Sequence, residues 1–297
     1  MHLNPNPVML KELRGQMRGW RAFAVLTVYL LLLGCVTIAL YLAVYTTYSA
    51  AGAGGMLIGV RMGRTLFSGI VLLELLLMCF IAPAFTVGSI SGERERLTYD
   101  LLVITLLRPR TIIAGKLGAA LAYVVLLILA ALPLQSLAFI LGGVSPAELF
   151  IALGGLLVTA LASVSVGLFC SSLVRSTLLS TVLTYSVILF MTGGLPAILV
   201  MILIPLTGLW SSATPSWPIQ ALLIYGFGFL ACTNPFITAV LTEVVLLEKN
   251  AWLFFTLAVD GHGILLVSPW VVYVLLCLLA SLLLIALSVR LVRAPRG

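Results

Sequence analysis

Six long apolar runs dominate the chain and restrict what it can fold into. They cover Ala22–Tyr48, Thr65–Ile90, Ile112–Leu141, Ala147–Leu173, Leu178–Pro205 and Ser268–Val289. A helix needs about 20 apolar residues to cross the hydrocarbon core of a bilayer, and each run is long enough. Because unpaired backbone groups are costly in lipid, we expect helices rather than open strands. The sequence therefore predicts an all-α integral membrane protein with six transmembrane helices.

The few charges of the chain are distributed unevenly between the two sides that these spans define. Only 8% of the 297 residues are charged, whereas a soluble domain carries roughly 25%. The net charge of +7 would suit a nucleic-acid-binding protein, but most of it lies at the ends of apolar runs. With both termini in the cytosol, 13 of the 16 Lys and Arg residues are cytosolic and only Arg61, Arg64 and Lys249 lie outside. This split fits the positive-inside rule, so nucleic acid is not an expected partner.

The first 21 residues predict an amphipathic helix at the inner membrane surface. Asn6 can cap this helix and Pro7 can begin it. Apolar side chains recur on one face and basic side chains on another. The apolar set is Leu10, Leu13, Met17 and Trp20, and the basic set is Lys11, Arg14, Arg18 and Arg21. We expect the basic residues and Trp20 to anchor the helix in the membrane interface.

A short charged segment separates the second and third spans. It reads Ser91-Gly92-Glu93-Arg94-Glu95-Arg96-Leu97-Thr98-Tyr99-Asp100. Ser91-Gly92 can cap a helix whose first turn holds Glu93 and Glu95, because carboxylates are favourable at a helix N-terminus. The expected helix places Leu97, Leu101 and Ile104 on one face, ends at Arg108-Pro109, and is followed by Lys116 at the level of the lipid headgroups. The alternative is a solvated loop whose charges only set the topology.

Residues 207–267 form an outer region that is expected to enter the membrane without crossing it. Arg290, Arg293 and Arg296 need the same side as the N-terminal basic residues, so the number of full spans is even. Two half-helices, Trp217–Cys232 and Pro235–Leu247, can form a re-entrant hairpin, with Asn234 as cap and Pro235 at the first helical position. We expect one transmembrane domain over residues 1–297: interfacial helix 1–21, spans one to five in 22–206, re-entrant region 207–267, and span six with a basic tail in 268–297.

At three places the chain resembles the six-span permeases of type-2 ATP-binding-cassette exporters. The first is Asn6-Pro7-Val8 followed by Lys11-Glu12-Leu13-Arg14. The second is Gly88-Ser89-Ile90-Ser91-Gly92-Glu93-Arg94-Glu95 with Thr98 and Asp100-Leu101-Leu102, ending in Pro109-Arg110 and Gly115-Lys116. The third is Asn234-Pro235-Phe236 before the last span. One departure is Leu106, where these permeases usually carry proline.

This resemblance implies that the charged segment is a coupling helix that docks on a separate cytosolic ATPase. The residues it assigns to ATPase coupling are Ser91, Gly92, Glu93, Arg94, Glu95, Arg96, Thr98 and Asp100. It further implies a dimer, of this chain with itself or a sibling, whose seam is lined by the first, second and fifth spans. ATP and Mg would be bound by the partner ATPase, and the location would be a prokaryotic cytoplasmic (plasma) membrane.

The chain is expected to have no motor, catalytic set or metal site of its own. A phosphate-binding loop needs G-x-x-x-x-G-K-[ST], but Arg110 stands where the first glycine would precede Gly115-Lys116. Asp260 and His262 offer two potential ligands, which do not make a metal site. The five cysteines form no Cys-x-x-Cys pair, so neither a zinc site nor a disulfide framework is predicted.

Glu74 lies inside the second span, where a carboxylate costs roughly 2.5–3.5 kcal/mol on insertion scales. It is a candidate for the substrate path, or else a polar contact that fixes helix packing. Gly55, Gly59 and Gly63 repeat beside the outer end of this span, which suits either close helix contact or a flexible loop. The apolar spans favour export of an amphiphilic or lipid-linked cargo. The alternatives are an ATP-independent secondary transporter and a non-transporting scaffold that transmits force from an ATPase.

Overall fold

The computed structural model describes residues 7–17, 20–50, 55–97, 108–212, 216–249, 251–259 and 261–293. Six helices in these ranges are long and apolar enough to cross a membrane. They are Ala22–Thr47, Gly59–Ala84, Pro109–Leu141, Pro146–Leu173, Thr177–Pro205 and Pro269–Val292. The predicted all-α fold with six transmembrane helices is therefore confirmed.

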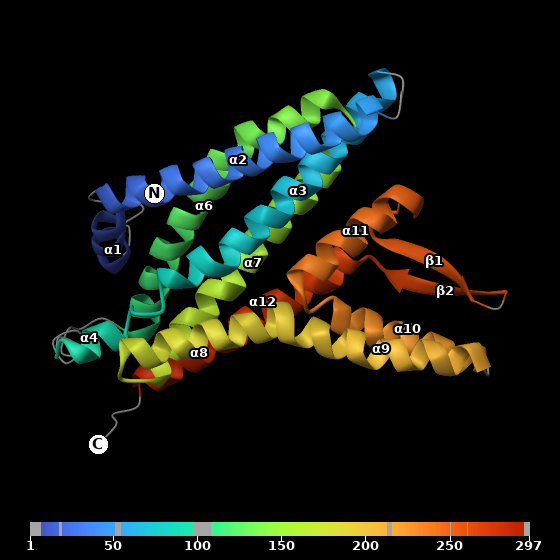
Figure 1. The fold of residues 1–297 in the computed structure, drawn as a ribbon. Helices are drawn as coiled ribbons and strands as arrows, with labels where there is room; N and C mark the ends of the chain where they lie inside the picture. Colours follow the sequence, from blue (N-terminus) through green and yellow to red (C-terminus); the bar gives the residue numbers. More distant parts are fainter. Residues whose placement is uncertain are drawn as a thin grey trace, which may run out of the picture. The chain divides into compact units, whose positions relative to one another are not determined.

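Figure 1 shows the elements in chain order. The helices are α1 (Pro7–Met17), α2 (Trp20–Ala50), α3 (Gly55–Ala84), α4 (Ser91–Glu95), α6 (Pro109–Leu141), α7 (Pro146–Leu173), α8 (Thr177–Leu189), η1 (Phe190–Gly194), α9 (Leu195–Ser212), α10 (Trp217–Ala231), α11 (Pro235–Lys249) and α12 (Pro269–Arg293). Strands β1 (Phe254–Val259) and β2 (His262–Val267) precede α12. The chain divides into two compact units. The first runs to Thr184 and resumes at Ser281, and the second is Tyr185–Ala280.

Helix α3 lies at the centre of the first unit, where it contacts α2, α6 and α7 (Figure 1). Its side chains Ile70 and Met78 are fully buried, as are Leu156 and Leu168 of α7. Small residues line the same contacts and are also fully buried: Ala82, Ala119, Ala120, Ala131, Ala138 and Ala160. Small side chains let helices approach closely where lipid supplies no hydrophobic driving force between them.

The inner end of α3 differs from the prediction, which extended this span to Ile90. The helix ends at Ala84, and residues 85–90 form a turn. The turn is held by backbone bonds of 2.9 Å from the amides of Thr86 and Val87 to the carbonyl of Pro83. The Thr86 hydroxyl also donates to the carbonyl of Val164 on α7, at 3.0 Å. This local bonding bends the chain along α7 instead of continuing the helix.

The second unit contains a break in the fifth apolar run and a β-hairpin. The run is helical as α8 and α9, but η1 between them is a π turn, which precedes Pro196. Helix α10 lies beside α9 and the hairpin, in which Phe254 pairs with Val267 and Val259 with His262. The half-helices predicted after residue 216 are confirmed as α10 and α11. The hairpin was not predicted: residues 254–259 and 262–267 were placed in the outer region 207–267, and no secondary structure was given to them.

Candidate functional site

The charged segment begins as helix α4, but with different ends from those predicted. Its N-cap is Ile90, so the prediction of a Ser91-Gly92 cap is wrong. Ser91 lies inside the helix, and its hydroxyl is 3.2 Å from that of Ser171 and donates to the carbonyl of Val87. The helix ends at Glu95, and Leu97 has a φ of 56°, in the left-handed region. A helix running unbroken from Glu93 past Leu97 is therefore also wrong. Pro109 is the first residue of α6, and the predicted face residues Leu101 and Ile104 lie outside the described residues.

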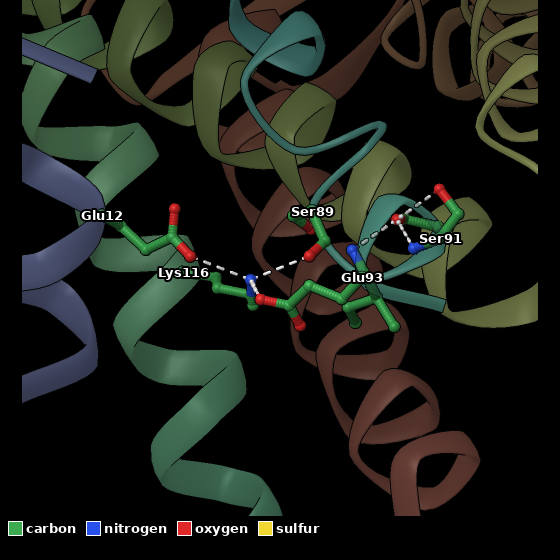
Figure 2. A network of polar contacts seen from close by, with 7 residues as sticks. Glu12, Ser89, Ser91, Glu93 and Lys116 are labelled. Carbon is green, nitrogen blue, oxygen red and sulfur yellow. Dashed lines mark hydrogen bonds and ion pairs between the residues drawn. The ribbon is translucent and has the colours of Figure 1, made fainter. Parts of the chain in front are cut away.

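Lys116 of α6 joins three separate parts of the chain (Figure 2). Its ammonium nitrogen donates to Oε1 of Glu12 on α1 and to Oε1 of Glu93 on α4, both at 2.9 Å, and to the carbonyl of Ser89 at 2.8 Å. Only 3% of the Lys116 side chain is exposed, so its ammonium is held by groups of the protein; its predicted place at the level of the headgroups stays a prediction. A buried ammonium is tolerated when acceptors satisfy its protons, and these three do so.

The end of α7 holds the other side of α4. The hydroxyl oxygen of Ser171 accepts from the backbone amides of Ile90 and Ser91, at 2.9 and 3.0 Å. The guanidinium of Arg94 donates to the carbonyls of Ser172 and Val174, at 3.0 and 3.3 Å. Carbonyls at a helix C-terminus lack partners within the helix, and a cation there is favourable. Both ends of α4 are thus bonded to the same turn of α7.

Glu95 caps a different helix from its own. Its carboxylate accepts from the backbone amide of Thr177 at 2.9 Å and from the Thr177 hydroxyl at 2.7 Å, at the first residue of α8. The hydroxyl first, and then the amide, lower the pKa of Glu95 from its usual value. The first residue of α8, where the fifth apolar run begins, is therefore capped by a side chain of α4.

Acidification is expected to release this cap. Because the pKa of Glu95 is lower in the folded chain than in the unfolded chain, its contribution is complete above about pH 4.3 and is lost as pH falls through the folded value. Glu95→Gln, which keeps an acceptor but cannot titrate, should flatten the fall of the melting temperature below that pH. Equal slopes for the two proteins would contradict the assignment. Melting of purified protein in detergent over pH 3 to 7, roughly the range of carboxylate titration, measures it.

An apolar cluster lies under α4 and fixes its base. Ile90, Ile113 and Leu168 are buried together with Val292 of α12. Leu117, Ile285 and Val289 pack against them. Ile90 is the N-cap of α4, and the other residues come from α6, α7 and the end of α12 that belongs to the first unit. Displacing α4 would therefore disturb apolar packing as well as polar bonds.

The predicted coupling residues fall into two groups in the structure. Ser91, Glu93, Arg94 and Glu95 bond to other helices of the first unit, and Gly92 packs on Thr177. Arg96 is exposed, as is its neighbour Leu97, which was not among the predicted residues. Thr98 and Asp100 lie outside the described residues.

Sequence reasoning missed the residues that hold the segment: Glu12, Ser171, Thr177 and the bonding role of Lys116. Only Glu12 could have been noticed in the sequence. It is the first acidic residue of the chain and the next is Glu74, so it is an isolated carboxylate in a basic and apolar stretch.

The N-terminal helix packs on α6, with the sulfur of Met9 close to Gly118. Lys11 and Arg14 are exposed, as their anchoring role requires. Trp20 is 77% exposed and is the first residue of α2 instead of the last of α1. Arg18 and the side chain of Arg21 lie outside what the structure describes. Anchoring in a membrane interface stays a prediction.

Glu74 is fully buried in the first unit, where its Oε2 accepts from Nε2 of Gln135 at 2.8 Å. The bond links α3 to α6, so of the two interpretations the geometry supports the packing contact. Among the described residues, no group of three or more His, Cys, Asp or Glu side chains could hold a metal ion.

Comparison with known proteins gives one family. A family model described as "ABC-2 family transporter protein" matches residues 7–293. No curated protein matches the chain. The match includes α4 and every helix that bonds to it.

Proposed function

Because the chain belongs to the ABC-2 transporter family and is a permease component of an ATP-binding-cassette transporter, we propose that it forms one half of an exporter driven by separate cytosolic ATPase subunits. In this proposal α4 receives the movement of the ATPase and passes it to the transmembrane helices. The chain itself is a multi-pass membrane protein. ATP and Mg²⁺ would be bound by the ATPase, which carries out hydrolysis.

The observation that carries the proposal is the bonding of α4 to four other helices. Glu93 leads through Lys116 to α6 and α1, Arg94 and the amide of Ser91 lead to α7, and Glu95 leads to α8. A solvated loop that only sets topology needs none of these contacts. A helix that must transmit displacement needs them, because force passes only through groups that move together.

We propose a division of work within the charged segment. Glu93, Arg94 and Glu95 hold α4 in the permease, while Arg96 and Leu97, with Thr98 and Asp100, contact the ATPase. Leu97 supports this, since 82% of this apolar side chain is exposed and its backbone is left-handed. Left-handed geometry is uncommon for a non-glycine residue, and such positions cluster at functional sites. Leu97 follows a helix that is held in place by bonds to other helices, so its exposed side chain is suited to enter a groove of a partner protein.

The remaining parts of the proposal concern the assembly around this chain. A second permease subunit, identical or related, would complete the path, and two ATPase subunits would bind the pair. Exposed apolar side chains on the first and fifth spans support a seam there, including Val28, Leu31, Val182 and Leu189. The second span is more buried within the protomer than either. The distribution of Lys and Arg supports cytosolic termini in a prokaryotic plasma membrane. The apolar surface supports an amphiphilic or lipid-linked cargo.

Leu97→Asn tests the proposed contact. Asparagine tolerates left-handed backbone and removes the apolar side chain, so α4 should stay in place. We expect the ATPase to co-purify with the tagged wild-type chain in mild detergent and its recovery with Leu97→Asn to fall by about tenfold, as for loss of a buried interface side chain. ATP hydrolysis in the eluate should fall in parallel.

A matched control is Leu253→Asn, which changes an exposed leucine in the second unit. This variant should recover as much ATPase as the wild type. If no ATPase follows the wild type in several detergents, the proposal of an ATPase-driven permease half fails. If ATPase follows both variants equally, the permease reading survives and the contact role of Leu97 is wrong.

A further inference from the structure

The π turn η1 leaves two backbone carbonyls without their regular helical partners. In an α-helix the carbonyl of Thr192 would accept from the amide of residue 196, and in a π turn the carbonyl of Met191 would accept from that same amide. Residue 196 is proline, which has no N–H. The turn is closed by the amide of Leu195 on the carbonyl of Phe190. The carbonyls of Met191 and Thr192 therefore have no amide donor at position 196.

Asn234 supplies the missing donors from outside the helix. Its Nδ2 donates to the carbonyl of Met191 and to the carbonyl of Thr192, both at 2.9 Å. Its Oδ1 accepts from the amides of Phe236 and Ile237 at the start of α11, at 2.9 and 3.1 Å. The side chain is fully buried, and every residue in this set belongs to the second unit. Both protons and both acceptor sites of the amide are used.

We propose that Asn234 is a positioning residue that holds the break in the fifth span by replacing the absent amide of Pro196. The inference is independent of any ATPase and goes beyond the proposed function. It joins the break to the start of α11, because moving either would remove the donor from the carbonyls of Met191 and Thr192. The break is therefore held in place in this structure, and releasing it requires the two bonds from Asn234 to the carbonyls of Met191 and Thr192 to break.

The alternative is that Asn234 only caps α11, as the sequence predicted. Aspartate and serine cap helices about as well as asparagine, but aspartate carries no N–H and serine has a short hydroxyl in place of the amide. Asn234→Asp and Asn234→Ser therefore keep the cap and remove the bond to the bend. Serine is neutral, so its result does not depend on burying a carboxylate.

Hydrogen–deuterium exchange of the full chain in detergent tests the proposal. Both variants should exchange about tenfold faster than wild type in peptides covering 188–200, as expected for loss of two hydrogen bonds. Peptides from the start of α11 should be unchanged. Pro196→Ala provides the second arm, since it restores the N–H at position 196. In that background the effect of Asn234→Ser should fall to less than about threefold, because the two changes share one interaction.

Three results would overturn the proposal. One is faster exchange confined to the start of α11, which would leave Asn234 a cap only. Another is an equal effect of Asn234→Ser with and without Pro196→Ala. The third is unchanged exchange over 188–200 in both single variants. If Asn234→Asp cannot be purified, Asn234→Ser carries the same test.

Discussion

Lys116→Met is expected to weaken the attachment of α1 and α4 to α6 and to destabilise the chain by about 3 kcal/mol. Breaking a buried ion pair costs about 3–5 kcal/mol, because the charge left behind is uncompensated. The lower end applies here, since Glu12 and Glu93 keep 27% and 19% of their side chains exposed. Without the ammonium, two carboxylates would face each other beside the carbonyl of Ser89.

Two measurements check this expectation on purified protein in detergent. The melting temperature should fall by about 6–12 °C, at roughly 2–4 °C per kcal/mol. Trypsin should cleave faster at Lys11 and Arg14 of α1. Their side chains are already exposed, but a helix held less firmly to α6 unfolds more often and presents its backbone to the protease.

The matched control is Lys11→Met, which removes the same charge from an exposed position and should have little effect. Neutralising the carboxylates as well, with Glu12→Gln and Glu93→Gln, should recover much of the loss, since a buried ionic cluster can be replaced at little cost when all its charges go together. A triple variant as unstable as Lys116→Met would show that the damage comes from shape and not from charge.

Gly63→Ala should strongly damage the packing of α3 against the end of α6. A Cβ at this position would collide with the backbone carbonyl of Gly142 and lie 2.7 Å from that of Ala138. Both are backbone atoms, so α3 and the end of α6 would have to separate. Overpacking of this kind typically costs 1–3 kcal/mol, and we expect about 3 because no side chain can move aside.

Gly59→Ala is a control four residues earlier on the same helix. Its Cβ would meet only the carbonyl of Leu141, at an ordinary 3.5 Å, and alanine favours a helix over glycine by about 1 kcal/mol. This variant should be neutral or more stable, while Gly63→Ala melts several degrees lower. Equal melting temperatures would mean that α3 and α6 do not approach closely at Gly63. The glycine repeat was left open between close contact and a flexible loop, and the structure supports close contact at Gly63.

The apolar runs determined the spans because length and hydropathy act locally. Span boundaries were predicted well where proline or a cap marked them, as at Pro146, where Ser145 accepts from the amide of Glu148. The inner end of α3 was placed too late, because its turn depends on Thr86 bonding to α7, a contact 78 residues away in sequence. The hairpin was missed although Asp260-Gly261 is a strong turn signal, since its strands lie in continuous apolar sequence.

The sequence marked the charged segment but not the bonds that hold it, and its role as a coupling site stays a prediction. Four alternating charges marked the segment, and the family resemblance gave them one role, contact with a partner. Their side chains instead bond inward at Glu93, Arg94 and Glu95. Their partners Lys116, Ser172 and Thr177 are distant in sequence and are ordinary residue types at helix ends. No local pattern identifies such partners, because the contacts exist only once α6, α7 and α8 are assembled.

The seating of α4 also affects how such permeases diversify. The segment cannot be exchanged between relatives as an isolated cassette, because Glu12, Lys116, Ser171 and Thr177 form its socket and come from four different helices. A segment grafted alone would keep its exposed residues and lose its bonds to these four helices. If the proposed ATPase contact is correct, changes of partner should accumulate at Arg96 and Leu97, whose side chains are exposed, while Glu12, Lys116, Ser171, Thr177 and the α4 residues that bond to them covary as a set.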